Sequence, residues 1–406
     1  MTASVVVVAH RHHDWLVPCL ASVVEQCEEV VVVDNGSEEG AVGRAVRDYA
    51  SRVVRLDHNV GFSAGVNAGS AVVRSDVIGV LNDDAFADPD WLASAAKILT
   101  DESCAAVGPK LTVARPYARL LLSDTPHFAG GDPRPLGRCV FTATAGEADV
   151  LDRLVGTGIH QLEHLARDGQ LLRWRWTAGG SAPVFLPLDP DLDPDAVLLN
   201  GEPVEVDPTP VTLVNSAGTF LTRRGFAGDI GYLAPDCGQF DLPADRFGIS
   251  GAALVTTRRI LQTVGIFAEH FFAYYEDLDW CWRAQLAGLR VRYDPTVSVR
   301  HVGGVTSGGP GNAAVMRLAA RNRYLALARN APLNVLLREL RDFRSDPIRT
   351  GLSVSLGRRL PKALLRERRM LARRWHRSPT EVWDAWAGVN EHWGEAGICG
   401  PAGRPN

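Results

Sequence analysis

The stretch SVVVVAH, residues 4–10, decides the fold class of this chain. Four consecutive valines favour an extended strand that is buried on both faces, as in parallel sheets covered by helices on either side. The pattern recurs in EEVVVVDNGS at 28–37 and in DVIGVLNDD at 76–84, and both runs end in turn-forming polar residues. The sequence therefore predicts several buried strands that end at polar turns.

Segments with helical spacing alternate with these strands. DWLVPCLASVVEQC at 14–27 places apolar residues at helical intervals behind a candidate N-cap, and AVGRAVRDYA at 41–50 continues the alternation. A short strand at 51–58 and a Gly-rich loop that runs into a helix at 59–73 follow. This alternation predicts an α/β fold with a Rossmann-like, mostly parallel central sheet and helices on both faces. Ligands of such sheets bind beyond the carboxyl ends of the strands.

Changes in composition divide the chain into four regions. The rhythm of strands and helices runs through residues 1–110 and returns in residues 215–330. Between them, residues 111–214 are dense in Pro, Gly and Asp, which predicts an insertion of short strands and long loops. Residues 331–406 read as a helical, basic C-terminal extension. We therefore expect two halves of one α/β domain with an insertion between them and an extension after them.

Charge is unevenly distributed although the formal net charge is only -4. The segment 338–377 carries thirteen Lys or Arg residues against four Asp or Glu residues, whereas residues 1–337 carry a net charge of -10. Its Leu, Met and Trp residues alternate with arginines, which is typical of a helix at an anionic membrane surface. The alternative is a solvated helix that packs its apolar stripe on the body. A nucleic-acid partner is not expected, because the body is acidic and carries no nucleic-acid-binding motif.

Cysteine usage and hydropathy indicate the compartment. The seven cysteines are scattered and form no Cys-x-x-Cys pair, which predicts neither a zinc site nor a disulfide framework. No window approaches the roughly 20 apolar residues that span a bilayer. The opening apolar run is too short for a signal peptide and has no basic leader. We therefore expect a cytoplasmic protein, peripheral on the inner face of the membrane if the basic segment binds lipid.

The adjacent acids Asp83 and Asp84 end the apolar run DVIGVLNDD at 76–84. Two readings are open for them. Asn and Asp favour polar turns at strand ends, and clustered carboxylates are also the ligands that hard divalent cations require. In a parallel sheet, Ala9, His10 and Asp34 fall at the same edge as these acids. Asp34 can accept a hydrogen bond from a base or a ribose hydroxyl, or it can simply shape the turn DNGS.

The Gly-rich stretch GFSAGVNAG at 61–69 matches neither common phosphate-binding motif. Its glycines are four residues apart, unlike G-x-G-x-x-G, and it lacks the Gly-Lys-Ser/Thr ending of a P-loop. Small residues before a helix still allow a phosphate or a sugar to approach the backbone. Close packing of the helix on the sheet explains the same glycines equally well.

The stretch YYEDLDW at 274–280 combines aromatic residues with acids at the start of a predicted helix. A helix N-terminus favours ionised carboxylates, so Glu276 and Asp277 are candidates for a base that accepts a proton from a hydroxyl. Ordinary helix capping by acids is the alternative. His301 ends a later strand, VSVRH, and would reach the edge that carries Asp84 if both strands belong to one sheet. His and carboxylate side chains together suit Mn²⁺ or Mg²⁺.

Seven ordered motifs resemble those of family 2 glycosyltransferases of the GT-A fold, and particularly the bacterial rhamnosyltransferase-like enzymes. They cover roughly residues 4–110 and 215–325. The motifs are VVVVAHRHHDWLVPCLASV, VVVVDNGS, NVGFSAGVNAG, VLNDDA, GISGAALVTTRR, VGIFAEHFFAYYEDLDWCWRAQLAGLRVRYDP and VRHVGGVTS. The resemblance implies that residues 1–110 form the nucleotide-sugar-binding half of the domain and residues 215–330 the acceptor and catalytic half.

The resemblance also implies a role for each candidate residue. Asp84 and His301 match positions that bind a divalent metal, Mn²⁺ or Mg²⁺. Asp277, with Glu276 beside it, matches the base of an inverting transfer onto a hydroxyl of a glycan, a lipid-linked saccharide or another acceptor. Positions implied to contact the nucleotide-sugar donor are Ala9, His10, Arg11, Asp34, Asn59, Gly61, Asn67 and Asp83. The rhamnosyltransferase-like branch implies dTDP-L-rhamnose as the donor, and UDP-linked sugars are the alternative.

Two departures from the family pattern keep some assignments open. The first strand ends in AHRHH where relatives usually carry a sequence such as Thr-Tyr-Asn, and Asp83 stands where they often carry proline. Both acids of the pair are therefore candidates for the main metal ligand. A glycan-binding relative without catalysis and a sugar nucleotidyltransferase are the competing functions. The former predicts the loss of key acids, and the latter predicts a Gly-rich basic loop after the first strand, which AHRHHDW does not provide.

Overall fold

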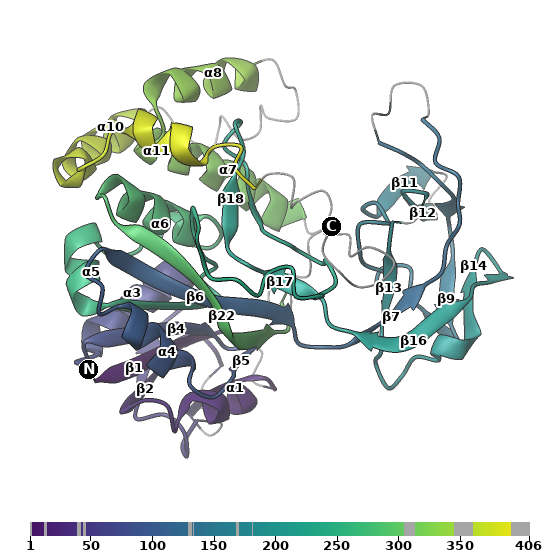
Figure 1. Cartoon of the computed structure of the whole chain (residues 1–406), viewed down its shortest axis with the longest axis horizontal. Coiled ribbons are helices and arrows are strands. Elements are labelled where there is room, and N and C mark those ends of the chain that lie inside the picture. The colour runs from purple at the N-terminus through teal and green to yellow at the C-terminus, as the bar shows by residue number, and fades with distance from the viewer. Residues whose placement is uncertain are drawn as a thin grey trace. The chain divides into compact units, whose positions relative to one another are not determined.

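The structure is a computed structural model, and it describes residues 2–11, 14–38, 42–43, 46–128, 132, 134–167, 170–180, 182–303, 313–344 and 360–390 (Figure 1). These residues form two compact units. The sheet unit lies within residues 1–111, 216–230 and 241–392, and the insertion unit comprises residues 112–215 and 231–240. Each unit is described by itself below.

A sheet of ten strands, counted over the described residues, forms the centre of the sheet unit. The strands are β1 Ala3–Ala9, β2 Glu29–Asn35, β3 Arg52–Leu56, β4 Val77–Asn82, β5 Ala85–Ala87, β6 Cys104–Val113, β17 Val214–Ser216, β20 Ala244–Asp245, β21 Ala253–Thr257 and β22 Arg290–His301. The main path runs β20-β22-β6-β21-β4-β1-β2-β3. Strands β4, β1, β2 and β3 are parallel, and β21 is antiparallel to both β4 and β6. The predicted α/β fold class is confirmed.

Strand β1 shows why the valine run is so strongly apolar. Val5 and Val7 lie in one hydrophobic cluster, and Val6 and Val8 lie in another on the opposite face. The helices that contribute to the first cluster are α1 Leu16–Val23 and α4 Trp91–Ile98, and those that contribute to the second are α3 Phe62–Val72, α5 Arg258–Val264 and α6 Glu276–Leu286. Each buried valine contributes about 1.5 kcal/mol to folding.

Helix α3 lies unusually close to the sheet, and its glycines permit this approach. A Cβ atom added at Gly69 would lie 2.4 Å from Cγ1 of Val6, and one added at Gly65 would lie 2.7 Å from Cγ1 of Val8. The spacing of four residues places both glycines on one helix face, above β1. Helix–sheet packing therefore accounts for these two glycines of the stretch 61–69.

We predict that Gly69→Ala destabilises the protein by about 1–3 kcal/mol, because the added methyl group overpacks the contact with Val6. Urea unfolding followed by circular dichroism measures this loss. Gly43→Ala is the matched control, since a Cβ at Gly43 meets no atom within 4 Å. Equal stability of the Gly69 variant and the wild type would show that α3 does not pack this closely.

The C-terminal helices belong to the sheet unit and cover α6. They are α7 Ala313–Asn330, α8 Leu333–Arg344, α10 Leu360–Leu371 and α11 Pro379–Trp386, and Figure 1 shows them on one side of the unit. Trp282 of α6 packs against Trp383 of α11 in a cluster that also holds Leu327 and Val335. The helical extension therefore shares a core with the rest of the unit.

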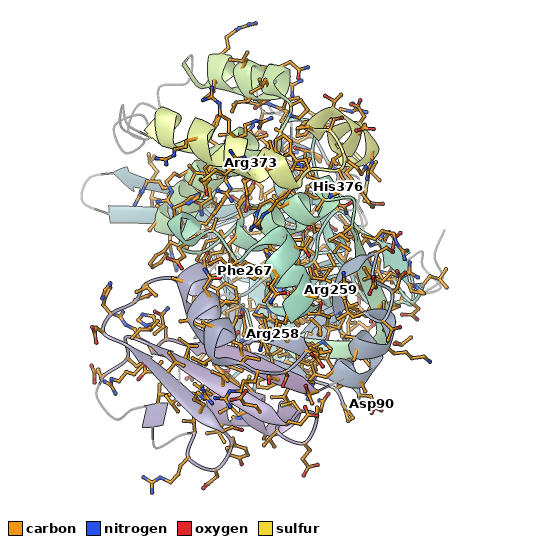
Figure 2. All side chains as sticks on the ribbon, turned by 90° about the vertical axis from the view of Figure 1, so that its left-hand side faces the viewer. Asp90, Arg258, Arg259, Phe267, Arg373 and His376 are labelled. Atoms are coloured by element: carbon orange, nitrogen blue, oxygen red, sulfur yellow. The ribbon has the colours of Figure 1, made fainter. Side chains whose placement is uncertain are left out.

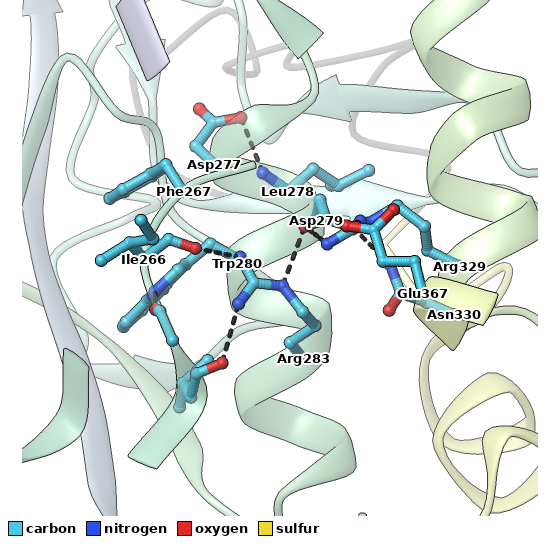
Figure 3. Close-up of polar contacts among 12 residues, drawn as sticks. Ile266, Phe267, Asp277, Leu278, Asp279, Trp280, Arg283, Arg329, Asn330 and Glu367 are labelled. Carbon is cyan, nitrogen blue, oxygen red and sulfur yellow. Dashed lines mark hydrogen bonds and ion pairs between the residues drawn. The ribbon is translucent and has the colours of Figure 1, made fainter. Parts of the chain in front are cut away.

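A buried charge network joins α6 to these helices (Figure 3). Oδ2 of Asp279 accepts a hydrogen bond from Arg283 at 2.9 Å, and Oδ1 accepts from Arg329 and Asn330, both at 2.7 Å. Arg329 also pairs with Glu367 of α10. Burial would raise the pKa of Asp279, but Arg329 and Arg283 outweigh it and lower the pKa to about 2. The carboxylate therefore stays ionised within the core.

Part of the predicted basic segment takes part in this packing. Arg368 donates to the backbone oxygens of Ala328 and Ala331 at 3.1 and 2.7 Å. Beyond α10, the backbone N–H groups of His376 and Arg377 both donate to the oxygen of Leu286 at the end of α6. Figure 2 shows His376 on the C-terminal helical side of the sheet unit, as it does Arg373. The side chain of Arg368 and the backbone at His376 and Arg377 are thus structural partners of the body.

The insertion unit consists of short strands and loops. Its strands are β7 Tyr117–Leu120, β8 Cys139–Val140, β9 Ala143–Ala145, β10 Ala148–Asp149, β11 Glu163–Arg167, β12 Gln170–Trp176, β13 Val184–Pro187, β14 Val197–Leu199, β15 Glu202–Pro203 and β16 Val206–Val211. They form three small sheets, β10-β9-β14-β15, β11-β12-β8 and β13-β7-β16. The unit has a hydrophobic cluster of its own, to which Val140, Leu151 and Leu186 belong.

Two expectations about cysteines and membrane spans can be compared with the structure. Among the cysteines that it describes, five are free thiols, whereas Cys237 is disulfide-bonded. The scattered cysteines predict no disulfide framework, so the sequence does not anticipate the bond at Cys237. In the described part of the chain, every helix is too short or too polar to cross a bilayer.

Candidate functional site

The carboxyl ends of β1, β2 and β4 meet at one edge of the sheet. Ala9 is in register with Asp34, and Val8 is in register with Asn82, the residue before the acid pair. The backbone N–H of His10 donates to Oδ2 of Asp83 at 3.3 Å. This edge therefore brings together the residues that end three strands, as expected for a parallel sheet.

Asp84 and His301 lie side by side. Nε2 of His301 is 3.1 Å from Oδ1 of Asp84, and the backbone N–H of Gly303 donates to Oδ2 of Asp84 at 3.0 Å. The antiparallel pairing of β5 with β22, in which Ala85 is opposite His301, holds the two side chains together. Asn82 also reaches Nε2 of His301 at 3.2 Å. The strand that carries His301 thus brings it to the edge that carries the acid pair.

The two acids of the pair have different electrostatic environments. Burial and the charge of Asp84 raise the pKa of Asp83 to about 7. Burial also acts to raise the pKa of Asp84, but the hydrogen bond and the charge of His301 outweigh it and lower that pKa. Asp84 is therefore the fully ionised member near neutral pH, and Asp83 carries a partial charge.

In the described part of the chain, no group of three or more His, Cys, Asp or Glu side chains is arranged to hold a metal ion. Asp84 and His301 provide a pair, with Asp83 next to them. A Mg²⁺ or Mn²⁺ ion commonly takes one or two carboxylates from the protein and its other ligands from water and substrate phosphates. The donor set is therefore compatible with a substrate-completed ion and not with a closed structural site.

The predicted donor contacts near β2 mostly make intramolecular bonds. Oδ1 of Asp34 accepts from the N–H of Ser37 at 3.0 Å, and Arg55 lies 3.6 Å from its Oδ2. Asn59 accepts from the side chain of Asn35 at 3.1 Å and from the N–H of Gly61 at 2.9 Å. These bonds shape the turn after β2 and the loop before α3.

Two further predicted donor residues differ in their surroundings. Arg11 is exposed beside the strand end and has a left-handed backbone, with φ of 69°. Asn67 instead faces the core, where its amide exchanges hydrogen bonds with the backbone of Phe267 at 2.9 and 3.0 Å and donates to Glu269 at 3.1 Å. Figure 2 labels Phe267 near the middle of the view, below Arg373 and His376. The structure thus places Arg11 with the strand-end residues and Asn67 apart from them.

Asp277 lies in the first turn of α6. The N–H of Gly251 donates to its Oδ2 at 2.8 Å. The N–H of Leu278 donates to its Oδ1 at 2.7 Å (Figure 3). Burial raises the pKa of this carboxyl. Both oxygens are therefore oriented by backbone amides and keep lone pairs with which to accept a proton.

Glu276, beside it, is buried with 6% of its surface exposed. Its Oε2 has no hydrogen-bond partner among the described residues. Burial and the charge of Asp277 raise the pKa of Glu276 well above its usual value. Burial therefore favours the neutral form of Glu276, which makes it a weaker candidate for the base than Asp277.

The loop before α6 has an unusual backbone. Phe272, Tyr274 and Tyr275 all have positive φ, at 69°, 68° and 71°. Each such conformation costs about 1–3 kcal/mol of folding free energy, so it persists only where the surrounding contacts enforce it. The backbone oxygen of Phe272 accepts from the N–H of Ser63 at 3.2 Å, and a Cβ at Gly61 would lie 2.5 Å from that oxygen. The strained loop therefore contacts the start of α3.

Asp229 is a half-buried acid that sequence reasoning missed. It ends β19 (Ala227–Asp229), which pairs with β18 (Thr219–Leu221), and Thr219 is opposite Asp229. Burial and the charge of Asp277 raise the pKa of Asp229 to about 6. Its Oδ1 has no partner among the described residues. The surrounding sequence GDIGY has no periodic pattern, so only the tertiary structure identifies this acid.

We predict that Glu276→Gln stabilises the protein by about 1 kcal/mol or more at pH 8, because a neutral amide of the same shape avoids the cost that the raised pKa of Glu276 imposes there. The unfolded state ionises Glu276 above its normal pKa while the folded state does not, so the wild type loses stability as pH rises between the two pKa values. The gain should therefore be larger at pH 8 than at pH 4.

Urea unfolding at both pH values tests this, with the exposed Glu102→Gln as a control. A gain that is the same at both pH values would contradict a raised pKa at Glu276.

Residues 4–119 match the family model described as Glycosyl transferase family 2, which confirms the resemblance to family 2 glycosyltransferases over this region, while the rhamnosyltransferase-like branch stays a prediction. No curated protein matches the chain.

Three solved structures are similar to the chain. The first is GalNAc-T7 with UDP, GalNAc and Mn²⁺, at 12% identity and a TM-score of 0.46, with 81% of this chain and 50% of that chain covered. The second is the mannosyltransferase PcManGT from Pyrobaculum calidifontis with GDP-Man and Mn²⁺, at 13% identity and a TM-score of 0.41, with 95% of this chain and 87% of that chain covered. The third is S. aureus TarS 1-349 with UDP-GlcNAc, at 21% identity and a TM-score of 0.24, with 27% of this chain and 34% of that chain covered. The chain thus spans half of the GalNAc-T7 chain and about a third of the TarS chain.

Proposed function

We propose that this protein is a metal-dependent, inverting glycosyltransferase that transfers a sugar from a nucleoside diphosphate to a hydroxyl group. The observation that carries the proposal is the pairing of Asp84 with His301, 3.1 Å apart, at the carboxyl edge of the sheet. The family match over residues 4–119 supports it, since this region includes β1 to β6 and the acid pair. The amide-held carboxylate of Asp277 supplies the second component of the site.

Asp277 acts as the base in this mechanism. Its carboxylate accepts the proton of the acceptor hydroxyl while the hydroxyl oxygen forms a bond to the anomeric carbon of the donor. The bond from that carbon to the diphosphate oxygen breaks on the opposite face, and its electron pair leaves with the nucleoside diphosphate. The pKa of Asp277, raised by burial, brings its basicity closer to neutral pH, where a general base is most effective.

Asp84 and His301, with Asp83 beside them, would hold the divalent metal. Carboxylate and imidazole donors at the edge of the sheet fit Mn²⁺ or Mg²⁺. When bound, the metal stabilises the negative charge that develops on the diphosphate leaving group. A nearby cation would also favour the ionised form of Asp83, because it offsets the repulsion between Asp83 and Asp84.

The donor is proposed to be dTDP-L-rhamnose, with UDP-linked sugars as the alternative. The rhamnosyltransferase-like motifs favour the former. Residues proposed to contact the donor are Ala9, His10, Arg11, Asp34, Asn59, Gly61 and Asp83, as the motif positions imply. Asn67 is proposed to act indirectly, because its amide bonds to Phe267 support the helix α3 that follows the loop.

We expect Asp277→Asn to lower metal-dependent turnover by about 100-fold or more, because the amide cannot accept the proton. The measurement is release of nucleoside diphosphate from a panel that contains dTDP-L-rhamnose, UDP-glucose, UDP-GlcNAc and GDP-mannose, with Mn²⁺, with Mg²⁺ and with EDTA. Asp384→Asn on the exposed face of α11 is the matched control.

Turnover of one donor that requires metal and is lost only in the Asp277 variant supports the proposal. Metal-dependent nucleotide binding without turnover, even with added saccharides, would instead favour a catalytically inactive relative. Formation of a nucleotide sugar from a nucleoside triphosphate and a sugar phosphate would identify a sugar nucleotidyltransferase.

We further propose that helix α8 contacts an anionic membrane, which would bring the enzyme to a lipid-linked acceptor. Leu333, Leu337 and Leu340 lie on one face of α8 and are 54%, 61% and 40% exposed. Arg341 is exposed on the same helix, and the opposite face, with Val335, is buried in the core. An exposed apolar stripe beside arginines is typical of an interfacial helix.

Leu337→Asp should weaken binding to vesicles of phosphatidylcholine mixed with phosphatidylglycerol by about tenfold, because it removes one leucine from the lipid contact. Co-sedimentation measures the bound fraction, and vesicles of phosphatidylcholine alone should bind little. Leu242→Asp is the control, since Leu242 is 80% exposed elsewhere on the unit. Equal losses in both variants, or no binding by the wild type, would argue against the membrane contact.

A further inference from the structure

Asn322 of α7 makes an unusual set of contacts with the strained loop before α6. It is fully buried, and its Nδ2 lies 2.9, 2.8 and 2.7 Å from the backbone oxygens of Phe271, Ala273 and Tyr274. One side-chain amide therefore collects three carbonyl groups from four consecutive residues. The oxygen of Phe271 has other donors as well, whereas Ala273 and Tyr274 lie outside any helix or strand, so that no regular secondary structure pairs their carbonyl groups.

Arg321 sets the orientation of this amide. Its guanidinium donates to Oδ1 of Asn322 at 2.9 and 3.0 Å and also donates to the backbone oxygens of His270 and Phe271 at 2.8 and 3.0 Å. Because Oδ1 faces a group that can only donate, Nδ2 must face the carbonyls. The two neighbouring residues of α7 thus hold the loop from two sides.

The same face of α7 continues along α6. Leu325 and Ala326 pack on the buried ring of Phe271, and Arg329 pairs with Asp279. With Asn322, these positions have the spacing i, i+3, i+4 and i+7 of one helix face. The segment from Phe271 to Asp279 is therefore held along its length by a single helix, and Asp277 lies within that segment.

The loop needs such support because of its conformation. Phe272 has φ 69° and ψ -68° and is the centre of a tight turn closed by a 2.9 Å bond from the N–H of Ala273 to the oxygen of Phe271. Tyr274 and Tyr275 follow in left-handed conformations. Strained residues of this kind persist where neighbouring contacts over-determine them, and they gather at functional sites. Asn322 contacts the oxygens of the first and last residues of this turn, Phe271 and Ala273, and that of Tyr274, which follows it.

We propose that Asn322 is a positioning residue for the transfer reaction, which clamps the strained loop and so fixes where Asp277 meets the acceptor hydroxyl. This inference rests on the proposed function, in which Asp277 is the base. Asn322 touches neither substrate nor metal in this proposal. It acts through the backbone of residues 271–275, which leads directly into the first turn of α6.

The test compares Asn322→Asp and Asn322→Ala with Asn330→Ala. The Asp variant keeps the size of the side chain but loses both donors, and the Ala variant removes the side chain without adding a buried charge. Asn330 is a matched control, because it is fully buried on the same helix and donates to Asp279 instead of to the loop. The probe is hydrolysis of the donor that the wild type turns over in the nucleotide-sugar panel, with water as the acceptor.

We expect both Asn322 variants to lower kcat by about 100-fold, the effect of misplacing a catalytic group by about 1 Å. KM for the donor should change less than kcat, because most of the proposed donor residues lie at the ends of β1, β2 and β4 and not on this loop, although Gly61 contacts Phe272. Hydrogen exchange should become faster in peptides that cover residues 270–279. Asn330→Ala should leave kcat within about threefold, even if it lowers thermal stability, because Arg283 and Arg329 still neutralise Asp279.

A pH profile separates positioning from simple loss of folded protein. Loosening the loop admits water to Asp277, whose burial-raised pKa should then fall, so the acid limb of kcat should move to lower pH in Asn322→Ala. The charge of Asp277 also acts on Glu276, Asp229, Tyr275 and Cys281, and the substitution replaces none of them. A smaller active fraction would lower kcat equally at every pH.

Three results would overturn the clamp. Unchanged exchange in residues 270–279 would show that Asn322 does not hold the loop. Faster exchange with kcat unchanged would show that the loop does not position the base. An equal loss of kcat in Asn330→Ala would show that general stability is responsible. Failure of the wild type to turn over any donor would instead contradict the proposed function, while the exchange measurement would still report on the loop.

Discussion

The neutralisation of Asp279 is the interaction on which the packing of α6 and α7 in the sheet unit depends. A carboxylate without exposed surface cannot stay charged in a protein core unless cationic and polar partners surround it. Arg283 supplies one partner from the same helix, and Arg329 and Asn330 supply the others from α7. Removing one member of such a network typically costs about 3–5 kcal/mol. Helix α7 must therefore lie against α6 in one fixed register.

This register has consequences at both ends of α6. At its N-terminal end, the same face of α7 reaches the loop with three left-handed residues and keeps it in place. At its C-terminal end, the chain after α10 returns to Leu286. The first turn of α6 thus presents Asp277 from a rigid frame, with Gly251 close enough for its N–H to orient the carboxylate. Rigid support of this kind is what a proton acceptor needs to meet a hydroxyl at a defined point.

The proposed metal site at the edge of the sheet depends on repulsion between like charges. Asp83 and Asp84 repel each other at the edge of the sheet, and burial makes this repulsion stronger. His301 relieves it on one side only, so the edge retains an affinity for positive charge. The acids therefore store an electrostatic cost in the free protein, which a bound cation would offset. The Asp84 and His301 pair and the Asp277 carboxylate are thus poised for different ligands.

Several features of this arrangement were predictable from the sequence. The valine-rich runs correspond to β1 and β2 almost residue for residue, because β-branched runs and turn residues act locally. The meeting of Asp84 with His301 was also predictable in outline, since both end strands of one sheet. Asp34 and Asn67 show the limit of such reasoning, because a residue type says nothing of which neighbour uses its hydrogen bonds.

The sequence by itself determined the buried strands, the polar edge where they end and the acids at the start of α6, because propensity and periodicity depend only on neighbours along the chain. Only the tertiary structure decided that Asp229 senses the charge of Asp277 and that Asn322 holds the loop before it. These contacts join residues about 50 positions apart, and they arise from how helices and hairpins pack. Packing satisfies buried charges and carbonyl groups wherever the fold brings a partner, and no local pattern encodes that choice.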